Sequence, residues 1–343
     1  MRVMGILLLD SFRMLRARRL FWVALCLSGL IAMVYASIGF DEGGVSVLFG
    51  LLSFESELLQ MRAEESKKVY LLVFTNVVVP YWLGLFSIVL ALISCASIFP
   101  EFTRKGSIDL ALSKPPSRLS LFLGKYVGSL LFVLLQVIPF TVIVFVSLGA
   151  RFGDWNPTVF WAVPLVVLSF SFVYAAHVLV AVWSGSTILG LFFALLVWGG
   201  SVIVEWAEDI SYQVAYTVPQ MGIEFEWDKG DYQEVEPNES SEDFMVRLHG
   251  VLDLVRLSLP KTRAVGAQMR SLIKLDSTDG GLQGKGLLAL LFEDPDDLVP
   301  EHHTAAERRA DQRHNVWKDL GSSLLYELAL AGFAALIFVR RDY

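Results

Sequence analysis

Charged residues are scarce in this sequence. Only 18% of its 343 residues are charged, whereas 55% are hydrophobic. Soluble domains average about 25% charged and about 45–50% apolar residues. The mean hydropathy of the chain is +0.55. This composition excludes an ordinary soluble globular domain and predicts a chain that lies mostly in a membrane.

Cysteine is almost absent as well. The two cysteines, Cys26 and Cys95, lie inside apolar runs, where a thiol packs as a small hydrophobic group. The sequence therefore indicates neither a disulfide framework nor a thiolate metal site. The apolar stretch after the first arginine cluster has the length of a membrane span and no small-residue cleavage site behind it. We therefore expect no cleaved signal peptide.

Motifs for nucleotide binding and hydrolysis are also missing. The sequence has no Gly-x-x-x-x-Gly-Lys-Ser/Thr motif, whose backbone amides would hold phosphates. It has no His-Glu-x-x-His motif of the zinc proteases either. We predict no catalytic residue, no metal and no cofactor bound by this chain, and no nucleic-acid partner.

Long apolar runs are what the sequence has in abundance. A helix of about 20 apolar residues crosses the hydrocarbon core of a bilayer, which is about 30 Å thick. Six runs reach this length, at residues 20–38, 69–99, 119–148, 158–182, 186–206 and 322–339. Residues 45–54 are apolar but too few to span, so they predict an interfacial or packed segment. The predicted fold class is an all-α polytopic membrane protein with six transmembrane helices.

Lysine and arginine cluster before the first run, between the second and third, and after the sixth. An even number of spans separates these clusters, and cytosolic flanks carry an excess of basic residues. We therefore expect both termini in the cytosol and the chain in the plasma (inner) membrane. The expected divisions are a cytosolic amphipathic helix (1–19), spans one to five (20–206) with a cytosolic loop (100–120), an extracytoplasmic module (207–321), and the sixth span with a cytosolic tail (322–343).

The first division predicts a helix with two faces. Met4, Leu8, Phe12 and Leu15 share one face, and arginines lie on the other. Such a helix lies in the membrane interface with its arginines near anionic headgroups, so membrane lipid is an expected partner. The simpler interpretation of the same segment is an ordinary basic flank that orients the first span by the positive-inside rule.

The polar stretch at 207–321 is the only one of domain-like length. Residues 240–243 read as a helix start. Apolar residues follow at helical spacing, and Pro260 ends the pattern. We expect a small, mostly helical module that could recruit an extracytoplasmic partner.

The segment between the second and third spans is the most informative. Ser107 can cap a short helix, and Lys114, Pro115 and Pro116 end it. A compact helix held between two spans can transmit a rigid-body push, whereas a flexible linker cannot. The residues expected to form this coupling loop are Glu101, Gly106, Ser107, Ile108, Leu110, Leu112, Pro115, Ser117, Arg118, Gly124 and Lys125.

These residues resemble the first cytosolic loop of the permeases of ABC type-2 exporters. That loop reads approximately Glu, three residues, Gly-Thr, a short Leu-rich helix, Ser-x-Pro-x-Ser-Arg, a few apolar residues and Gly-Lys. Here Ser107 replaces the threonine, and the Glu-to-Gly interval is one residue longer. The ending at 338–342 and the amphipathic helix before the first span are similar too.

The resemblance implies a set of partners. In that family the loop helix docks on a separate ABC ATPase subunit, which binds ATP and Mg²⁺. Two permease copies or paralogues form the substrate path. The resemblance therefore implies an exporter subunit that dimerises and moves a substrate across the membrane.

Two other classes of function stay open at this point. One is a membrane scaffold that recruits partners through the external module without transport. The other is an intramembrane hydrolase built on His177, with Ser184 on roughly the same helical face. Within the spans, His177 and Glu205 are candidate pathway residues. The simpler interpretations are a histidine bonded inside the bundle and a glutamate among the headgroups.

Overall fold

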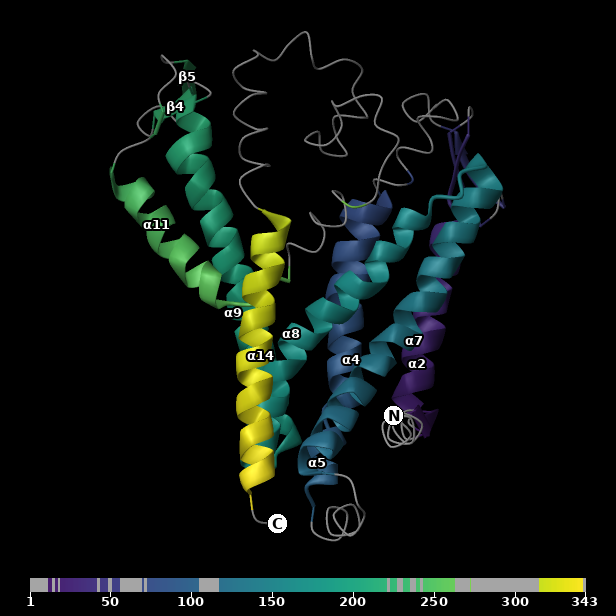
Figure 1. Cartoon of the computed structure of the whole chain (residues 1–343). Helices are drawn as coiled ribbons and strands as arrows, with labels where there is room; N and C mark the ends of the chain where they lie inside the picture. Colours follow the sequence, from purple (N-terminus) through teal and green to yellow (C-terminus); the bar gives the residue numbers. More distant parts are fainter. Residues whose placement is uncertain are drawn as a thin grey trace.

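Six long helices dominate the computed structural model of the chain (Figure 1). The structure describes residues 12–13, 16–17, 19–41, 44–48, 51–55, 70, 73–104, 117–220, 223–226, 231–234, 239–240, 243–262, 272 and 315–341. Within these residues, six helices are long and apolar enough to cross a membrane. This finding confirms the predicted all-α polytopic fold with six spans.

The spans lie close to the predicted apolar runs. The first is α2 (Arg19–Ser37), the third is α7 (Arg118–Phe152) and the sixth is α14 (Val316–Arg340). The second consists of the π-helix η2 (Phe74–Phe86), α4 (Ser87–Cys95) and α5 (Ile98–Phe102). The fourth consists of the 3-10 helix η3 (Pro157–Trp161) and α8 (Ala162–Ser184). The fifth consists of α9 (Thr187–Tyr212), the π-helix η4 (Gln213–Thr217) and α10 (Val218–Gln220).

Local sequence explains where several spans begin and end. The hydroxyls of Ser117 and Ser186 accept hydrogen bonds from backbone amides in the first turns of α7 and α9, as N-cap side chains do. Gly153 and Gly185 follow α7 and α8 with φ angles of 67° and 70°. This left-handed conformation ends helices and favours glycine. Short-range sequence thus fixes the turns that join spans three, four and five.

The fifth helix continues past Trp206, where the sequence analysis ended the span. Together α9, η4 and α10 make 34 residues, from Thr187 to Gln220. At 1.5 Å per residue they extend about 51 Å, more than the roughly 30 Å of a hydrocarbon core. The start of the polar stretch is therefore a helical extension of span five that projects from the membrane.

Short strands follow the first and fifth spans. The strands β1 (Gly39–Asp41), β2 (Gly44–Val47) and β3 (Leu52–Glu55) pair antiparallel in that order, with Val45 opposite Phe54. A second pair joins β4 (Ile223–Glu226) to β5 (Asp231–Glu234). The apolar run 45–54 therefore folds back on itself as β2 and β3. The helix expected before Pro260 is α11 (Asp243–Ser258).

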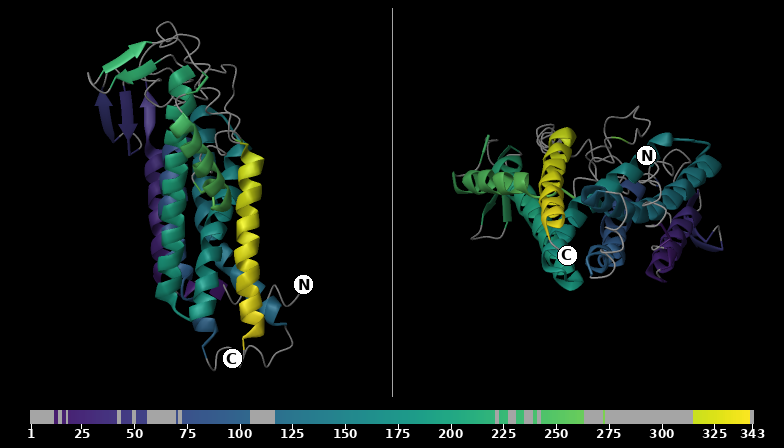
Figure 2. Two further views of the ribbon diagram at one scale, coloured as in Figure 1. Left: turned by 90° about the vertical axis from the view of Figure 1, so that its left-hand side faces the viewer. Right: turned by 60° about the horizontal axis from the view of Figure 1, so that its bottom comes forward.

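The helix α8 lies at the centre of the bundle. It packs against α4, α7, α9 and α14. In the apolar 18-residue stretch that marks its span, 78% of the residues are buried, against 17% in the corresponding stretches of the fifth and sixth spans. At one end of the bundle, α5 and α14 terminate and α7 begins (Figure 1). We call this the basic end, because it carries Arg118, Arg340 and Arg341; both sheets and α11 lie toward the opposite end (Figure 2).

Candidate functional site at the basic end of the bundle

The structure describes both ends of the predicted coupling loop. Glu101 lies exposed near the end of α5, and the remaining described residues lie at the start of α7. The loop residues outside the described part of the chain are Gly106, Ser107, Ile108, Leu110, Leu112 and Pro115. The described residues show how the two ends of the loop are anchored.

Arg118, the first residue of α7, binds the end of the sixth span. Its guanidinium group donates hydrogen bonds to the carbonyl oxygens of Val339 and Arg341, each at 3.0 Å. The last carbonyls of a helix have no intrahelical partner, and they attract positive charge. Arg118 therefore ties the end of the loop to the C-terminal end of α14.

Arg341 extends this connection to the fourth span. Its guanidinium group donates to the carbonyl oxygens of Val182 at 2.6 Å and Trp183 at 3.3 Å, in the last turn of α8. Two arginines thus bind the orphan carbonyls of two helix ends in succession. The order of contacts runs from α7 through α14 to α8.

An aromatic cluster connects the other end of the loop to the same place. The ring of Phe102, the last residue of α5, stacks on Phe338 at a centroid distance of 5.9 Å and an interplanar angle of 17°. Phe122 of α7 lies 5.8 Å from Phe338 on another side. The ammonium group of Lys125 lies 5.4 Å from the centroid of Phe102, within cation–π range. Lys125 and Gly124 are buried.

These contacts form one unit, which we call the basic-end clamp: Phe102, Arg118, Phe122, Lys125, Phe338 and Arg341. The clamp joins α5, α7, α8 and α14 around the two ends of the loop. Sequence reasoning found Arg118 and Lys125 through the motif. It assigned no role to Phe102 or Phe338, because an aromatic residue in an apolar run carries no distinguishing signal.

His177 has a structural role that the sequence explains. Its Nε2 atom lies 2.9 Å from the carbonyl oxygen of Ala96, so the ring nitrogen must donate. The residue four positions after Ala96 is Pro100, which has no N–H group, and the helix of span two is interrupted at Ala96 and Ser97, between α4 and α5. His177 therefore supplies the donor that Pro100 cannot.

The surroundings of His177 do not resemble a hydrolase site. Its ring stacks on Tyr174 at 5.6 Å, and the hydroxyl of Ser184 donates to the carbonyl of Val180. Among the described residues, no serine hydroxyl is hydrogen-bonded to His177. A pathway role for His177 stays a prediction.

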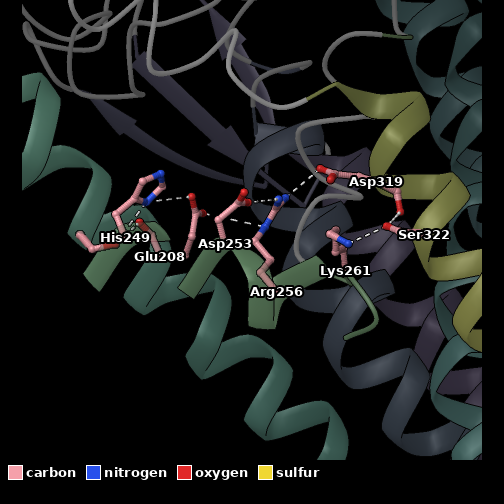
Figure 3. A network of polar contacts seen from close by, with 8 residues as sticks. Glu208, His249, Asp253, Arg256, Lys261, Asp319 and Ser322 are labelled. Carbon is pink, nitrogen blue, oxygen red and sulfur yellow. Dashed lines mark hydrogen bonds and ion pairs between the residues drawn. The ribbon is translucent and has the colours of Figure 1, made fainter. Parts of the chain in front are cut away.

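Glu205 lies buried on α9 toward the opposite end of the bundle, with 5% of its surface exposed. It lies near a network of polar side chains from α9, α11 and α14 (Figure 3). Arg256 of α11 is central, because its Nη2 atom lies 2.8 Å from Asp319 and its Nε atom 3.9 Å from Glu208. A pathway role for Glu205 also stays a prediction.

Glu327 is a polar residue that sequence reasoning missed. It lies near the middle of α14, with Oε1 2.9 Å from the hydroxyl of Tyr126 and Oε2 3.0 Å from the hydroxyl of Ser171. It therefore joins spans three, four and six inside the membrane, where ionisable residues are rare. The available signal was that Glu327 is the only charged residue in the apolar run 322–339.

Comparison with known proteins decides the family. The sequence profile described as "ABC-2 family transporter protein" matches residues 6–343. The chain belongs to the ABC-2 transporter family. No curated protein and no solved structure gives a significant match.

Membership in this family confirms the resemblance seen in the loop. An ABC-2 family chain with six apolar helices is a membrane-spanning permease subunit of an ABC transporter, and it is not itself an enzyme. The permease is a multi-pass membrane protein, and the family implies ATPase partners.

Proposed function

We propose that this permease is an exporter subunit that pairs with a second copy or a paralogue and couples to separate ATPase subunits through the loop at 100–120. The substrate path lies in the paired bundles. ATP and Mg²⁺ bind to the ATPase chains, since the sequence has no phosphate-binding loop. The basic end faces the cytosol of the plasma membrane, so both termini are cytosolic; the distribution of lysine and arginine supports this orientation.

The anchorage of the loop is the observation that carries the proposal. A coupling element must transmit force, so its ends must be fixed to the helices that move. Arg118 fixes one end of the loop to α14, and Phe102 fixes the other end to the same helix. A basic connector that served only to orient the protein would not need these contacts.

The clamp suggests how motion spreads. When ATP closes a pair of ATPase subunits, a push on the loop would reach α5 and α7 directly. Arg118 would pass it to α14, and Arg341 to the central helix α8. Packed helices move as rigid bodies between discrete arrangements, so these four helices would rock together.

The proposal is tested by site-specific photo-crosslinking in cells that express the permease at native levels. A photoreactive amino acid at Ser117 should crosslink to a protein that contains a phosphate-binding loop. The same amino acid at Ser240, near the start of α11, serves as the matched control and should not. The purified permease alone should hydrolyse no ATP, whereas the complex isolated with its crosslinking partner should.

Two results would contradict the proposal. One is a crosslink to an ATPase from Ser240 but not from Ser117. The other is robust ATP hydrolysis by the permease alone after contaminating ATPases are removed.

A further inference from the structure

Glu327 lies far from both ends of the bundle. Along the axis of α14 it is about 20 Å from Arg340 at the basic end and about 17 Å from Val316 at the other end. The hydrocarbon core is about 30 Å thick, so the carboxyl group lies near the middle of the membrane. On the same helix, Leu325 and Leu328 are 69% and 67% exposed, as side chains that face acyl chains are.

The carboxyl group of Glu327 is surrounded by neutral groups. Its hydrogen-bond partners in the described part of the chain are the hydroxyls of Tyr126 and Ser171, which are themselves buried. The titratable side chains that face it are tyrosines, namely Tyr126 on α7, Tyr174 beside it on α8 and Tyr326 on α14 itself. Tyrosines are neutral at physiological pH, so none of them balances a negative charge.

The basic side chains on the elements packed around this site bind other groups. Among the described residues, no ion pair joins Glu327 to a lysine, an arginine or a histidine. The bound groups are Lys125 over the ring of Phe102, His177 on the carbonyl of Ala96, Lys261 on the hydroxyl of Ser322 and Arg256 on the carboxylate of Asp319. An ionised carboxylate in hydrocarbon without a cation is so costly that the group takes up a proton instead.

The hydrogen bonds around Glu327 need more hydrogens than the two hydroxyls supply. The hydroxyl oxygen of Tyr126 lies 2.9 Å from Oε1 of Glu327 and 3.1 Å from the carbonyl oxygen of Ser171. The hydroxyl oxygen of Ser171 lies 3.0 Å from Oε2 and 2.8 Å from the carbonyl oxygen of Leu168. Each hydroxyl has one hydrogen. If Glu327 were ionised, all four of these neighbouring oxygens would be acceptors, and only two hydrogens would serve them.

A proton on Oε2 supplies the missing hydrogen. The acid O–H then donates to the hydroxyl oxygen of Ser171, and the hydrogen of Ser171 donates to the carbonyl of Leu168, which is the shorter of its two contacts. The hydroxyl of Tyr126 donates to Oε1, the carbonyl oxygen of the neutral acid. Each of the three side chains therefore donates one hydrogen, and the arrangement fits a neutral acid better than a carboxylate.

We propose that Glu327 is a proton-binding site inside the bundle: its carboxyl group is neutral while α14 packs against α7 and α8, and it gives its proton to water when these helices separate. The acid becomes a carboxylate and a water molecule takes the proton, so the step needs no other reactant. Binding of the proton and the packing of span six are therefore linked. This inference goes beyond the transporter assignment and does not depend on an ATPase partner.

Infrared difference spectroscopy of the purified permease in lipid tests whether Glu327 is neutral. At pH 7 the wild-type spectrum minus that of Glu327→Gln should contain the carbonyl stretching band of a protonated carboxyl group. The amide of the variant keeps the same donor and acceptor pattern. Glu239→Gln changes an exposed carboxyl at the opposite end and is the matched control; its difference spectrum should contain carboxylate bands only. Carboxylate bands alone for Glu327→Gln would overturn the proposal.

A second variant keeps the test usable if Glu327→Gln fails to fold. Tyr126→Phe removes the hydrogen bond to the carbonyl oxygen Oε1, and such a bond lowers the stretching frequency. The band of the protonated carboxyl group should therefore move to higher frequency in this variant. A band that stays in place would belong to another carboxyl group and would overturn the assignment to Glu327.

The pH dependence of unfolding tests the link between the proton and helix packing. In water a glutamate ionises near about pH 4.3, so the packed permease binds one proton more than the unfolded chain, and its stability falls as pH rises. Thermal unfolding in detergent is compared between about pH 6 and 8. The equilibrium constant for unfolding should rise by up to about tenfold per pH unit more in the wild type than in Glu327→Gln. The same pH dependence in both proteins would overturn the link.

Discussion

The side chain of His177 replaces a hydrogen bond that the sequence of span two removes. Pro100 leaves the carbonyl of Ala96 without its helical donor, and the imidazole Nε2 of span four supplies one at 2.9 Å. Gly190 of α9 lies against the same ring, since a Cβ there would be 3.0 Å from it. One histidine therefore holds three spans in contact.

Removal of this donor should destabilise the permease. His177→Phe keeps an aromatic ring but cannot donate a hydrogen bond. Because the buried carbonyl of Ala96 is then left without a donor, the free energy of unfolding should fall by about 1–3 kcal/mol. The measurement is thermal unfolding of the purified protein in detergent. In a Pro100→Ala background the restored backbone N–H can bond to Ala96, so the same substitution should cost less. An equal loss in both backgrounds would show that His177 acts in another way.

At the scale of elements, the basic-end clamp connects helix ends through their carbonyl groups. Arg118 and Arg341 each bind two carbonyl oxygens at the end of a helix. Such carbonyls need external donors in any case. The clamp therefore satisfies the ends of α8 and α14 and, at the same time, fixes the start of α7.

Arg118→Glu should uncouple the permease from its ATPase without unfolding it. Exposed ionic contacts usually contribute under about 1 kcal/mol, so the variant should insert normally and keep its unfolding temperature within a few degrees. The introduced carboxylate would repel the carbonyls of Val339 and Arg341, so substrate-linked ATP hydrolysis should fall to the basal rate of the complex.

Two matched variants control for this effect. Arg118→Lys keeps a positive donor and should retain most of the coupling, whereas Ser240→Ala at the opposite end should leave it unchanged. Normal coupled hydrolysis in the Arg118→Glu variant would leave the clamp without a role in coupling.

At the scale of the whole molecule, the even number of spans places the start of α2 and the end of α14 on one side. The positions of α11 and the strands at the opposite end follow from the same parity (Figures 1 and 2). In the orientation we propose, Ser117 is cytosolic and Ser240 is external.

This orientation predicts opposite labelling of the two positions. In intact cells that carry a cysteine-free background, a membrane-impermeant thiol reagent should modify a cysteine at Ser240 and not one at Ser117. Permeabilised cells should show modification of both, which controls for reactivity. Labelling at Ser117 alone in intact cells would reverse the orientation, and labelling at both would contradict six spans.

The sequence by itself determined the number of spans and the family. Apolar runs of about 20 residues must be helical in lipid, because every backbone polar group has to be satisfied within the segment. Turns such as Gly185–Ser186 are also local, since one residue adopts the left-handed conformation and the next caps the following helix. The loop motif led directly to Arg118.

Only the tertiary structure decided what the polar residues do. The bond from His177 to Ala96 joins residues 81 positions apart, and the bond from Tyr126 to Glu327 joins residues 201 positions apart. Periodicity predicted the helix α11, but it cannot say which side of a helix faces protein. That choice depends on where Glu208 and Asp319 lie, because a buried Arg256 is stable only beside carboxylates that other helices supply.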